Sequence, residues 1–370
     1  MSTAKPAPKR SMPTFEFSVI RRRLLRWYDR HKRDLPWRKT RDPYALWIAE
    51  TMLQQTQVNT VVPYYRSFLK AFPSLRALDR APREKVLALW SGLGYYRRAE
   101  NLKKAARVIA REHQGRMPQE FNTLRALPGI GDYTAGALAS IVFNQPHPAL
   151  DGNARRVLQR LFHAQKKTEL NELARKLISR SRPGDFNQAL MDLGSQVCLP
   201  QQPNCFACPC NRLCQAHLSG SYQLRDFRAA IKSVEIIWPL AIILRKGRIL
   251  LRRRAKKGLL AGLWEIPGGE KMRGEAPRQA LQRQLRSVNG VCRMTRLAGE
   301  VRHSITRYKI RSPIFVCSMS TDVSALGAGW RWVALASLKH YPLSSLSIKA
   351  VKLVTGGPSH AGKQRPSRVI

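Results

Sequence analysis

Residues 198–214 read CLPQQPNCFACPCNRLC, in which four cysteines follow the pattern C-x6-C-x2-C-x5-C. One loop with this spacing can wrap the soft thiolates of Cys198, Cys205, Cys208 and Cys214 around a compact inorganic core, which suits a [4Fe-4S] cluster. Structural zinc sites usually set two ligand pairs apart on separate knuckles, whereas this chain has one C-x2-C pair flanked by single cysteines. The spacing therefore favours an iron-sulfur cluster and leaves zinc as the alternative.

Three cysteines lie outside this pattern, of which Cys210, inside the loop, could compete for a ligand position but fits a cage poorly. Cys210 is separated from Cys208 by one residue, and Cys292 and Cys317 stand in hydrophobic or strand-like sequence that is typical of buried thiols. Cysteines gathered in one cluster do not make a disulfide framework. The chain also begins MSTAKPAPKRSMPTF, without an apolar signal core, and has no apolar run long enough to cross a membrane. We expect a cytoplasmic protein that does not enter a membrane.

The charge of the chain indicates its partner. Lysine and arginine number 66 against 23 aspartates and glutamates, which gives a formal net charge of +43. Such an excess attracts polyanions whatever their sequence, and in a protein with a cysteine cluster nucleic acid is the expected one. Basic residues are spread over the whole chain, so the charge indicates a class of partner and no particular site.

The pattern of apolar residues divides the chain near residue 218. Before this point they recur every three or four positions, as in helices over 18–32, 44–58, 64–72, 84–91, 96–113, 132–143 and 153–163. After it, strand patterns cover 234–244, 249–252 and 310–319, with one helix over about 276–288. We predict a basic disordered tail at 1–14, an all-α domain at 15–218, a linker at 219–233, a smaller α+β domain at 234–355 and a basic tail at 356–370.

A glycine-containing hairpin, Leu127-Pro128-Gly129-Ile130-Gly131, precedes one of the predicted helices. We expect the glycines to take positive φ, so that successive backbone N–H groups point outward at the start of the helix near Asp132. Helix N-termini bind anions readily, so these donors suit a phosphate of the DNA backbone. The alternative is an ordinary turn between packed helices.

Two acidic residues could carry chemistry. Glu50 lies three and four positions after Trp47 and Leu46, on the apolar stripe of its helix. Burial raises the pKa of a carboxyl, as a general acid near neutral pH requires, and a solvated or paired helix residue is the alternative. Asp151 stands directly before the helix predicted over 153–163, where a helix cap is the alternative to a second catalytic carboxylate.

The helical part resembles the helix-hairpin-helix base-excision glycosylases with a cysteine-ligated cluster, and among them the MutY-type adenine DNA glycosylases. The hairpin and the cysteine loop are shared with endonuclease III relatives, whereas the run around Glu50 is specific to the MutY type. The matching stretches are LPWR at 35–38, WIAETMLQQTQV at 47–58, GLGYY at 92–96, the hairpin at 127–131, LDGN at 150–153 and the cysteine loop.

The resemblance assigns roles to four residues. It makes Glu50 the acid that protonates adenine, and Asp151, with Asn153 nearby, the carboxylate that stabilises or traps the oxocarbenium-like sugar. Tyr133 stands where bifunctional relatives carry a Schiff-base lysine, so we expect base excision without an efficient lyase step. The chain would then be a hydrolase, an adenine-specific DNA N-glycosylase that flips the base out of the duplex and initiates base excision repair.

The resemblance also supplies candidate DNA contacts. Side chains that enter the base stack repay part of the cost of unstacking, and the matching residues are Gln54, Gln55 and Tyr95, with surface polar residues and a packed aromatic as the alternative. Further DNA-binding candidates are Leu127, Gly129, Gly131 and Arg155.

The C-terminal part resembles a Nudix domain. Glu275 falls six residues after Gly269 and Arg283 eight after that, as in a Nudix box. Gln284, Ser287 and Val288 stand where a hydrolase carries carboxylates for magnesium. The resemblance therefore favours a domain that recognises 8-oxoguanine opposite adenine and does not hydrolyse nucleotides.

A Phe-Ser-His loop of the family is replaced here by Ile305-Thr306-Arg307, in which Thr306 keeps a hydroxyl and is the candidate DNA contact. The expected partner is double-stranded DNA with A:8-oxoguanine or A:G mispairs, bound by a monomer associated with the nucleoid. Two alternatives remain: a related glycosylase for thymine or uracil opposite guanine, and a non-catalytic iron-sulfur DNA sensor. The intact Glu50 and Asp151 argue against the sensor.

Overall fold

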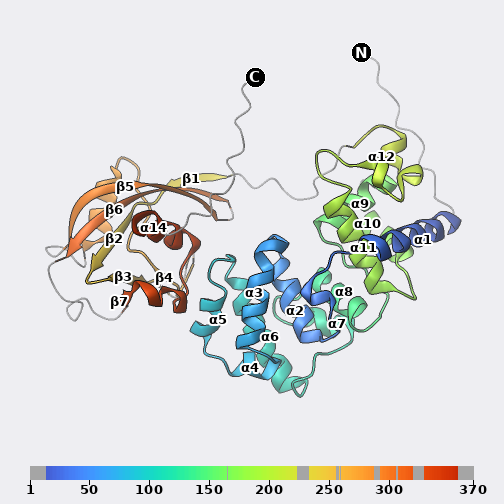
Figure 1. Cartoon of the computed structure of the whole chain (residues 1–370), viewed down its shortest axis with the longest axis horizontal. Coiled ribbons are helices and arrows are strands. Elements are labelled where there is room, and N and C mark those ends of the chain that lie inside the picture. Colours follow the sequence, from blue (N-terminus) through green and yellow to red (C-terminus); the bar gives the residue numbers. More distant parts are fainter. Residues whose placement is uncertain are drawn as a thin grey trace, which may run out of the picture. The chain divides into compact units, whose positions relative to one another are not determined.

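The structure is a computed structural model (Figure 1) that describes residues 14–164, 166–222, 233–255, 258, 260–286, 292–305, 307–319 and 329–356. The tails predicted at 1–14 and 356–370 lie almost wholly outside these ranges, as does most of the linker predicted at 219–233. Thr306, Ser287 and Val288 also lie outside them. Within the described ranges, no helix combines the length and the hydropathy needed to cross a membrane.

The chain forms two compact units, one of Met1–Asp79 with Asn101–Ala229 and the other of Arg80–Glu100 with Ala230–Ile370. A helical N-terminal part is followed by a part built on strands, as predicted. The described helices before the strands are α1 (Thr14–His31), α2 (Pro43–Leu53), α3 (Val58–Ala71), α4 (Leu75–Arg80), α5 (Arg83–Leu89), α6 (Arg97–Glu112), α7 (Phe121–Ala126), α8 (Asp132–Ile141), α9 (Gly152–Phe162), α10 (Lys167–Leu177), α11 (Pro183–Gln196) and α12 (Gln215–Leu218), with 3₁₀ turns at Pro36–Arg38, Cys205–Ala207 and Asn211–Leu213.

Helix α2 lies in the centre of the first unit. All its residues from Tyr44 to Met52 are buried, as expected for a helix that is apolar on every side. Its start is fixed by Asp42, whose side chain accepts a hydrogen bond from the backbone N–H of Tyr44 (3.0 Å). The helix predicted over 44–58 is in fact two helices, because α2 ends at Leu53 and α3 begins at Val58.

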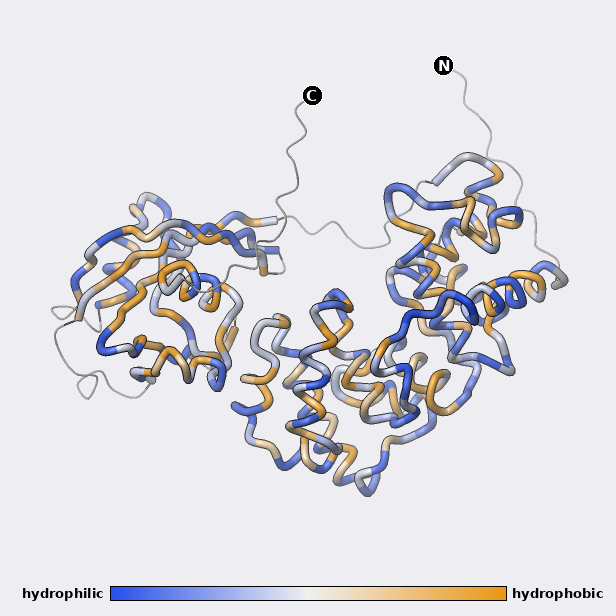
Figure 2. Tube along the Cα trace, viewed as in Figure 1, coloured by the Kyte–Doolittle hydropathy of each residue, from blue (hydrophilic) through white to orange (hydrophobic). Residues whose placement is uncertain are grey.

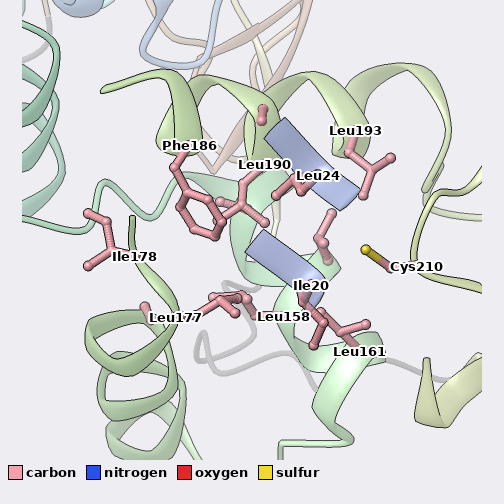
Figure 3. Packing of buried hydrophobic residues seen from close by; sticks show 14 of the residues in the cluster. Ile20, Leu24, Leu158, Leu161, Leu177, Ile178, Phe186, Leu190, Leu193 and Cys210 are labelled. Atoms are coloured by element: carbon pink, nitrogen blue, oxygen red, sulfur yellow. The ribbon is translucent and has the colours of Figure 1, made fainter. Parts of the chain in front are cut away.

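The first unit has an apolar core beside the cysteine loop. Helix α1 contributes Ile20 and Leu24, α9 contributes Leu158 and Leu161, and α11 contributes leucines and a phenylalanine. Cys210 belongs to this core, with 2% of its surface exposed. Figure 3 shows its sulfur directed toward the apolar side chains. The turn between Cys208 and Cys214 is therefore anchored by hydrophobic burial.

The second unit is built on a sheet. Its described strands are β1 (Val234–Ile237), β2 (Leu240–Arg245), β3 (Arg248–Arg253), β4 (Trp264–Glu265), β5 (Cys292–Ile305), β6 (Tyr308–Met319) and β7 (Trp330–Ala334). The strand order is β1-β6-β2-β3-β4, with β5 also paired to β6 and β7 to β3. Strand β6 runs parallel to β1 and β2 and antiparallel to β5, whereas β2 and β3 form an antiparallel pair.

Two helices cover the two faces of this sheet, α13 (Pro277–Gln284) and α14 (Ser345–Thr355). Side chains alternate between the faces of a strand, and β3 sends Ile249 and Leu251 into a cluster with α14 but Leu250 into a cluster that contains Leu281 of α13. The tube of Figure 2 shows hydrophobic and hydrophilic residues alternating along the elements of the chain. A mixed sheet between two helices is the result.

Candidate active site

Glu50 lies on α2 and only 4% of its surface is exposed. Its Oε2 accepts a hydrogen bond from the hydroxyl of Tyr133 at 2.6 Å. Burial raises the pKa of Glu50 to about 7, and the charge of Asp151 acts in the same direction, while the Tyr133 hydrogen bond and Arg38 lower it. A carboxyl with this pKa exchanges a proton near neutral pH, as the sequence predicted for this position.

Asp151 caps the N-terminus of α9, and it is close enough to Glu50 for its charge to act there. Its Oδ1 accepts from the backbone N–H of Ala154 (2.7 Å) and its Oδ2 from the side-chain amide of Asn153 (3.0 Å). Burial raises the pKa of Asp151, and these hydrogen bonds oppose that rise. The cap and a position beside Glu50 are thus compatible.

Asn153 and Arg156 connect Asp151 with the cysteine loop. The Arg156 guanidinium donates to Asn153 Oδ1 (2.8 Å), to the carbonyl of Gly194 (2.6 Å) and to the carbonyl of Cys198 (2.7 Å). Gly194 permits this approach, because a Cβ there would stand 2.6 Å from the Cβ of Asn153. The side-chain orientation of Asn153 is therefore fixed from α11 and from the start of the loop.

Tyr133 lies in the first turn of α8, directly after the hairpin. Its hydroxyl contacts Met191 Sδ (3.8 Å) in addition to Glu50. In the hairpin, Gly129 takes φ +80°, and a Cβ there would stand 2.6 Å from the Cβ of Asn101. The prediction of positive φ is wrong for Gly131, which has φ −101° because it is the N-cap of α8, a position that is normally extended. Leu127 is buried.

The candidate DNA contacts are distributed over both units. Gln54 is the C-cap residue of α2 and donates to Thr134 Oγ1 (3.3 Å), and the exposed Gln55 takes φ +61°. Arg155 is half-buried on α9 and donates to the carbonyl of Leu150 (3.2 Å). Tyr95 belongs to the unit that contains the sheet, where 48% of its surface is exposed.

The four predicted cysteine ligands lie together at one end of the first unit. Cys208 is close enough to the thiols of Cys198, Cys205 and Cys214 for their charges to raise its pKa, which burial brings to about 12. Cys198, Cys208 and Cys214 line a small apolar cavity together with Cys210, while the thiol of Cys205 faces the hydroxyl of Tyr222 (3.8 Å).

In the described parts of the chain, no group of three or more His, Cys, Asp or Glu side chains closes around a single metal ion. The donor set nevertheless fits an iron-sulfur cluster. Four thiols are present, and the positive charge of iron would offset the cost of holding buried thiolates.

A buried ion pair behind the site escaped the sequence analysis. Asp192 on α11 is fully buried, and its two oxygens accept from Arg38 (2.6 and 3.0 Å) and from Arg33 (2.7 Å). Arg38 also lowers the pKa of Glu50. Arg38 and Asp192 lie 154 residues apart in the sequence, so no local pattern signals that they pair.

The Nudix box has its expected arginine and glutamate in contact. Arg283 donates to both carboxylate oxygens of Glu275 (2.6 and 2.9 Å) and to the carbonyl of Glu270 (2.9 Å). Gln284 packs over Gly269, where a Cβ would stand 2.3 Å from its amide carbon. Gln284 stands where the resemblance to a Nudix hydrolase places a carboxylate, and Glu275 is paired with Arg283.

Comparisons with known proteins agree with this geometry. Residues 48–182 match the HhH-GPD superfamily of base excision DNA repair proteins, and residues 240–353 match the NUDIX domain. The chain is 34% identical to the adenine DNA glycosylase of Rattus norvegicus, in an alignment that covers 91% of this chain and 78% of the relative. It is 29% identical to the adenine DNA glycosylase of Schizosaccharomyces pombe, covering 92% and 90% of the two chains.

Two solved structures share the fold of the helical part. A thermostable thymine-DNA glycosylase is 30% identical with a TM-score of 0.53, covering 55% of this chain and 98% of its own. An endonuclease III in a non-covalent DNA complex is 21% identical with a TM-score of 0.51, covering 57% of this chain and all of its own. The coverage and identity of the curated relatives decide the assignment: the chain belongs to the adenine DNA glycosylases, within the HhH-GPD superfamily of base excision DNA repair proteins.

Proposed function

We propose that this protein removes adenine from duplex DNA opposite 8-oxoguanine or guanine, by hydrolysis of the N-glycosidic bond, and so initiates base excision repair. The observation that carries the proposal is the environment of Glu50. Its carboxyl is buried, its pKa is raised to about 7, and Tyr133 and Asp151 flank it. Burying an ionisable carboxyl in an apolar helix lowers stability, so its presence there indicates a functional role.

Glu50 acts as the general acid. Adenine is a poor leaving group as an anion, so transfer of the Glu50 proton to a ring nitrogen makes the base depart as a neutral molecule. The hydrogen bond from Tyr133 to Oε2 fixes the carboxyl, which leaves Oε1 as the oxygen that delivers the proton. The carboxylate that results can then accept a proton from the attacking water.

Asp151 stabilises the sugar. Loss of adenine leaves positive charge on the deoxyribose ring, and a carboxylate on its face lowers the energy of that state. Two hydrogen bonds hold Asp151 with one oxygen toward Ala154 and the other toward Asn153. These donors favour the ionised form of Asp151 and oppose the rise in its pKa that burial causes, so we assign the charged role to Asp151 and the acid role to Glu50.

The reaction ends with base excision. Tyr133 occupies the position after the hairpin, and a phenol cannot form the Schiff base that a lyase step requires. Gln54, Gln55 and Tyr95 enter the space that the flipped adenine vacates, and the hairpin with Arg155 contacts phosphates.

The C-terminal domain recognises the base opposite adenine. Ile305 ends β5 and Arg307 precedes β6, so the segment that carries Thr306 connects the two strands. Arg307 stacks on the ring of Tyr308 (5.2 Å from guanidinium carbon to centroid) and donates to its hydroxyl (3.2 Å). We do not propose magnesium-dependent hydrolysis by the Nudix box, because Gln284 stands in place of a carboxylate.

A [4Fe-4S] cluster would be held by Cys198, Cys205, Cys208 and Cys214. When bound, it would join the two ends of the loop around one inorganic core. The protein acts as a monomer, because one chain carries both the excision site and the domain for the opposite base. Its place is the cytoplasm, in association with the nucleoid through duplex DNA.

The competing function is excision of thymine or uracil opposite guanine, which the 30% identity to a thymine-DNA glycosylase favours. One assay separates the two. Purified protein is incubated with duplexes that contain A:8-oxoguanine, A:G, T:G or U:G, and abasic sites are then cleaved with alkali. Cleavage of the adenine strand supports the proposal, and cleavage confined to the T:G or U:G duplex refutes it. An inactive protein that still binds the duplexes would support a sensor.

A further inference from the structure

The loop that carries Tyr95 has a strained backbone. Gly92 and Gly94 take φ +105° and +71°, and Tyr95 itself takes φ +48°, although it is no glycine. A left-handed conformation is unfavourable for a residue with a Cβ, so the surroundings must hold it. Leu93 and Tyr96 on either side are buried, whereas the Tyr95 ring is half exposed. The loop presents one aromatic ring to the outside.

Part of this support comes from the adjoining helix and turn. Trp90 Nε1 donates to the carbonyl of Gly94 (3.1 Å), and Arg98 donates to the carbonyls of Leu93 and Gly94 (3.3 Å each). The Arg98 guanidinium also lies over the rings of Trp90 and Tyr95, at 5.4 and 5.5 Å from their centroids. These contacts hold the tip of the loop, and backbone hydrogen bonds from Ser91 to Ala88 (3.0 Å) and from Glu100 to Tyr96 (3.1 Å) connect its ends to α5 and α6.

The side chains at the two ends of the loop both contact one peptide of the C-terminal domain. Ser91 Oγ donates to the carbonyl of Leu343 (2.9 Å) and lies 3.3 Å from the Leu343 N–H. The Tyr96 hydroxyl donates to the same carbonyl. A carbonyl oxygen has two lone pairs, so Leu343 can serve both hydroxyls. Ser91 and Tyr96 are the residues directly before and after the segment Gly92–Tyr95.

Leu343 is buried and connected to the C-terminal sheet. Only 3% of its surface is exposed, and it forms a bridge to Trp264 of β4, whose N–H donates to the carbonyl of Pro342 (3.0 Å). An ion pair between Arg253 of β3 and Glu84 of α5 (2.7 Å) lies in the same compact unit. The C-terminal domain therefore contacts the loop through two hydrogen bonds, which the hydroxyls of Ser91 and Tyr96 donate to the Leu343 carbonyl.

We infer that the C-terminal domain braces the Tyr95 loop, and that Ser91 and Tyr96 are positioning residues for Tyr95. This inference rests on the proposed function in one respect, namely that Tyr95 enters the base stack of the DNA. It adds a second task to the C-terminal domain. Besides contacting the opposite base, the domain keeps the inserted ring in a conformation that the loop alone would not hold.

The test uses the full-length protein with the double substitution Ser91→Ala/Tyr96→Phe. The matched control is Tyr44→Phe, because Tyr44 is also a buried tyrosine whose hydroxyl donates to a backbone carbonyl (Phe72, 2.8 Å) away from this loop. Affinity is measured on an A:8-oxoguanine duplex, and unstacking is followed by the fluorescence of 2-aminopurine beside the mispair.

We expect the double variant to bind about tenfold more weakly, equivalent to about 1.4 kcal/mol, and to give a smaller fluorescence gain. Tyr44→Phe leaves both readouts unchanged. In a protein that already carries Tyr95→Ala, the double substitution has no further effect, because the brace acts only through Tyr95. Ser91→Thr, which keeps the hydroxyl, restores binding relative to Ser91→Ala and serves if the double variant does not fold.

Two results would overturn the brace. One is unchanged affinity and fluorescence in the Ser91 and Tyr96 variants, and the other is a loss that persists in the Tyr95→Ala protein. A separate result, Tyr95→Ala binding like the wild type, would refute the DNA role proposed for Tyr95, and the brace would fall with it.

Discussion

Replacing Glu50 by glutamine should make the protein more stable and nearly inactive. Glutamine keeps the shape of the side chain and an oxygen that accepts from Tyr133, but it carries no charge at any pH. The structure raises the pKa of Glu50 from 4.5 to about 7, chiefly by burial. At about 1.4 kcal/mol per pKa unit, the ionised carboxylate costs the native state on the order of 3 kcal/mol.

The sign follows from where the proton is bound. The folded pKa is the higher one, so the native state retains the proton that the unfolded chain releases, and stability is lost as pH rises from about 4.5 through about 7. The free energy of unfolding of Glu50→Gln should exceed that of the wild type by less than about 1 kcal/mol near pH 5 and by about 3 kcal/mol near pH 8. Groups titrating identically in both proteins cancel in this difference.

Urea unfolding of both proteins at the two pH values measures this difference. Single-turnover release of adenine should fall by roughly 10²-fold or more in the variant, while DNA affinity holds, because only the proton donor is removed. An unfolding difference that does not change with pH would refute the assignment of the raised pKa to Glu50. Excision at the wild-type rate would show that Glu50 is structural.

Three further outcomes follow from the same geometry. Tyr133→Phe removes a hydrogen bond that lowers the pKa of Glu50, so the alkaline limb of the single-turnover pH profile should move to higher pH; a shift to lower pH would contradict the role of this bond. Cys210→Ala should keep the brown colour and the broad absorbance near about 400 nm of a [4Fe-4S] protein, since Cys210 belongs to the apolar core, whereas Cys208→Ala should bleach it; colour lost in the first variant would make Cys210 a ligand. With magnesium and 8-oxo-dGTP the protein should release no pyrophosphate, because Gln284 replaces a carboxylate; measurable release would restore hydrolase activity to the Nudix box.

The sequence predicted those features that depend on local pattern. Apolar residues that repeat every two to four positions predict the helical part and the strands after residue 233. The same pattern places Glu50 among apolar neighbours. The break between Leu53 and Val58 could not be predicted in this way, because the glutamines and threonine between them include no glycine or proline that would mark a turn. Gly131 was misjudged because a glycine permits positive φ without requiring it, and its place as an N-cap decided otherwise.

Contacts between distant segments required the structure. Asp192 looks like any polar position of an amphipathic helix until Arg33 and Arg38 are found beside it. The grouping of residues 80–100 with the C-terminal sheet is likewise invisible in a sequence whose helical pattern continues across them. Such pairings depend on which surfaces meet, and no periodicity of one segment encodes its partner.

Hydrogen bonds link Asp151, the proposed catalytic carboxylate, to the cysteine loop of the same unit. Asp151 accepts from Asn153, Asn153 accepts from Arg156, and Arg156 donates to the carbonyl of Cys198, the first residue of the loop. Each bond is 3.0 Å or shorter, so a displacement of Cys198 would reach Asp151 through two side chains. A catalytic group must be held within a fraction of an ångström, and supports of this kind provide that precision. The loop that decides the fold in the sequence is therefore linked by hydrogen bonds to the carboxylate that we propose to stabilise the sugar.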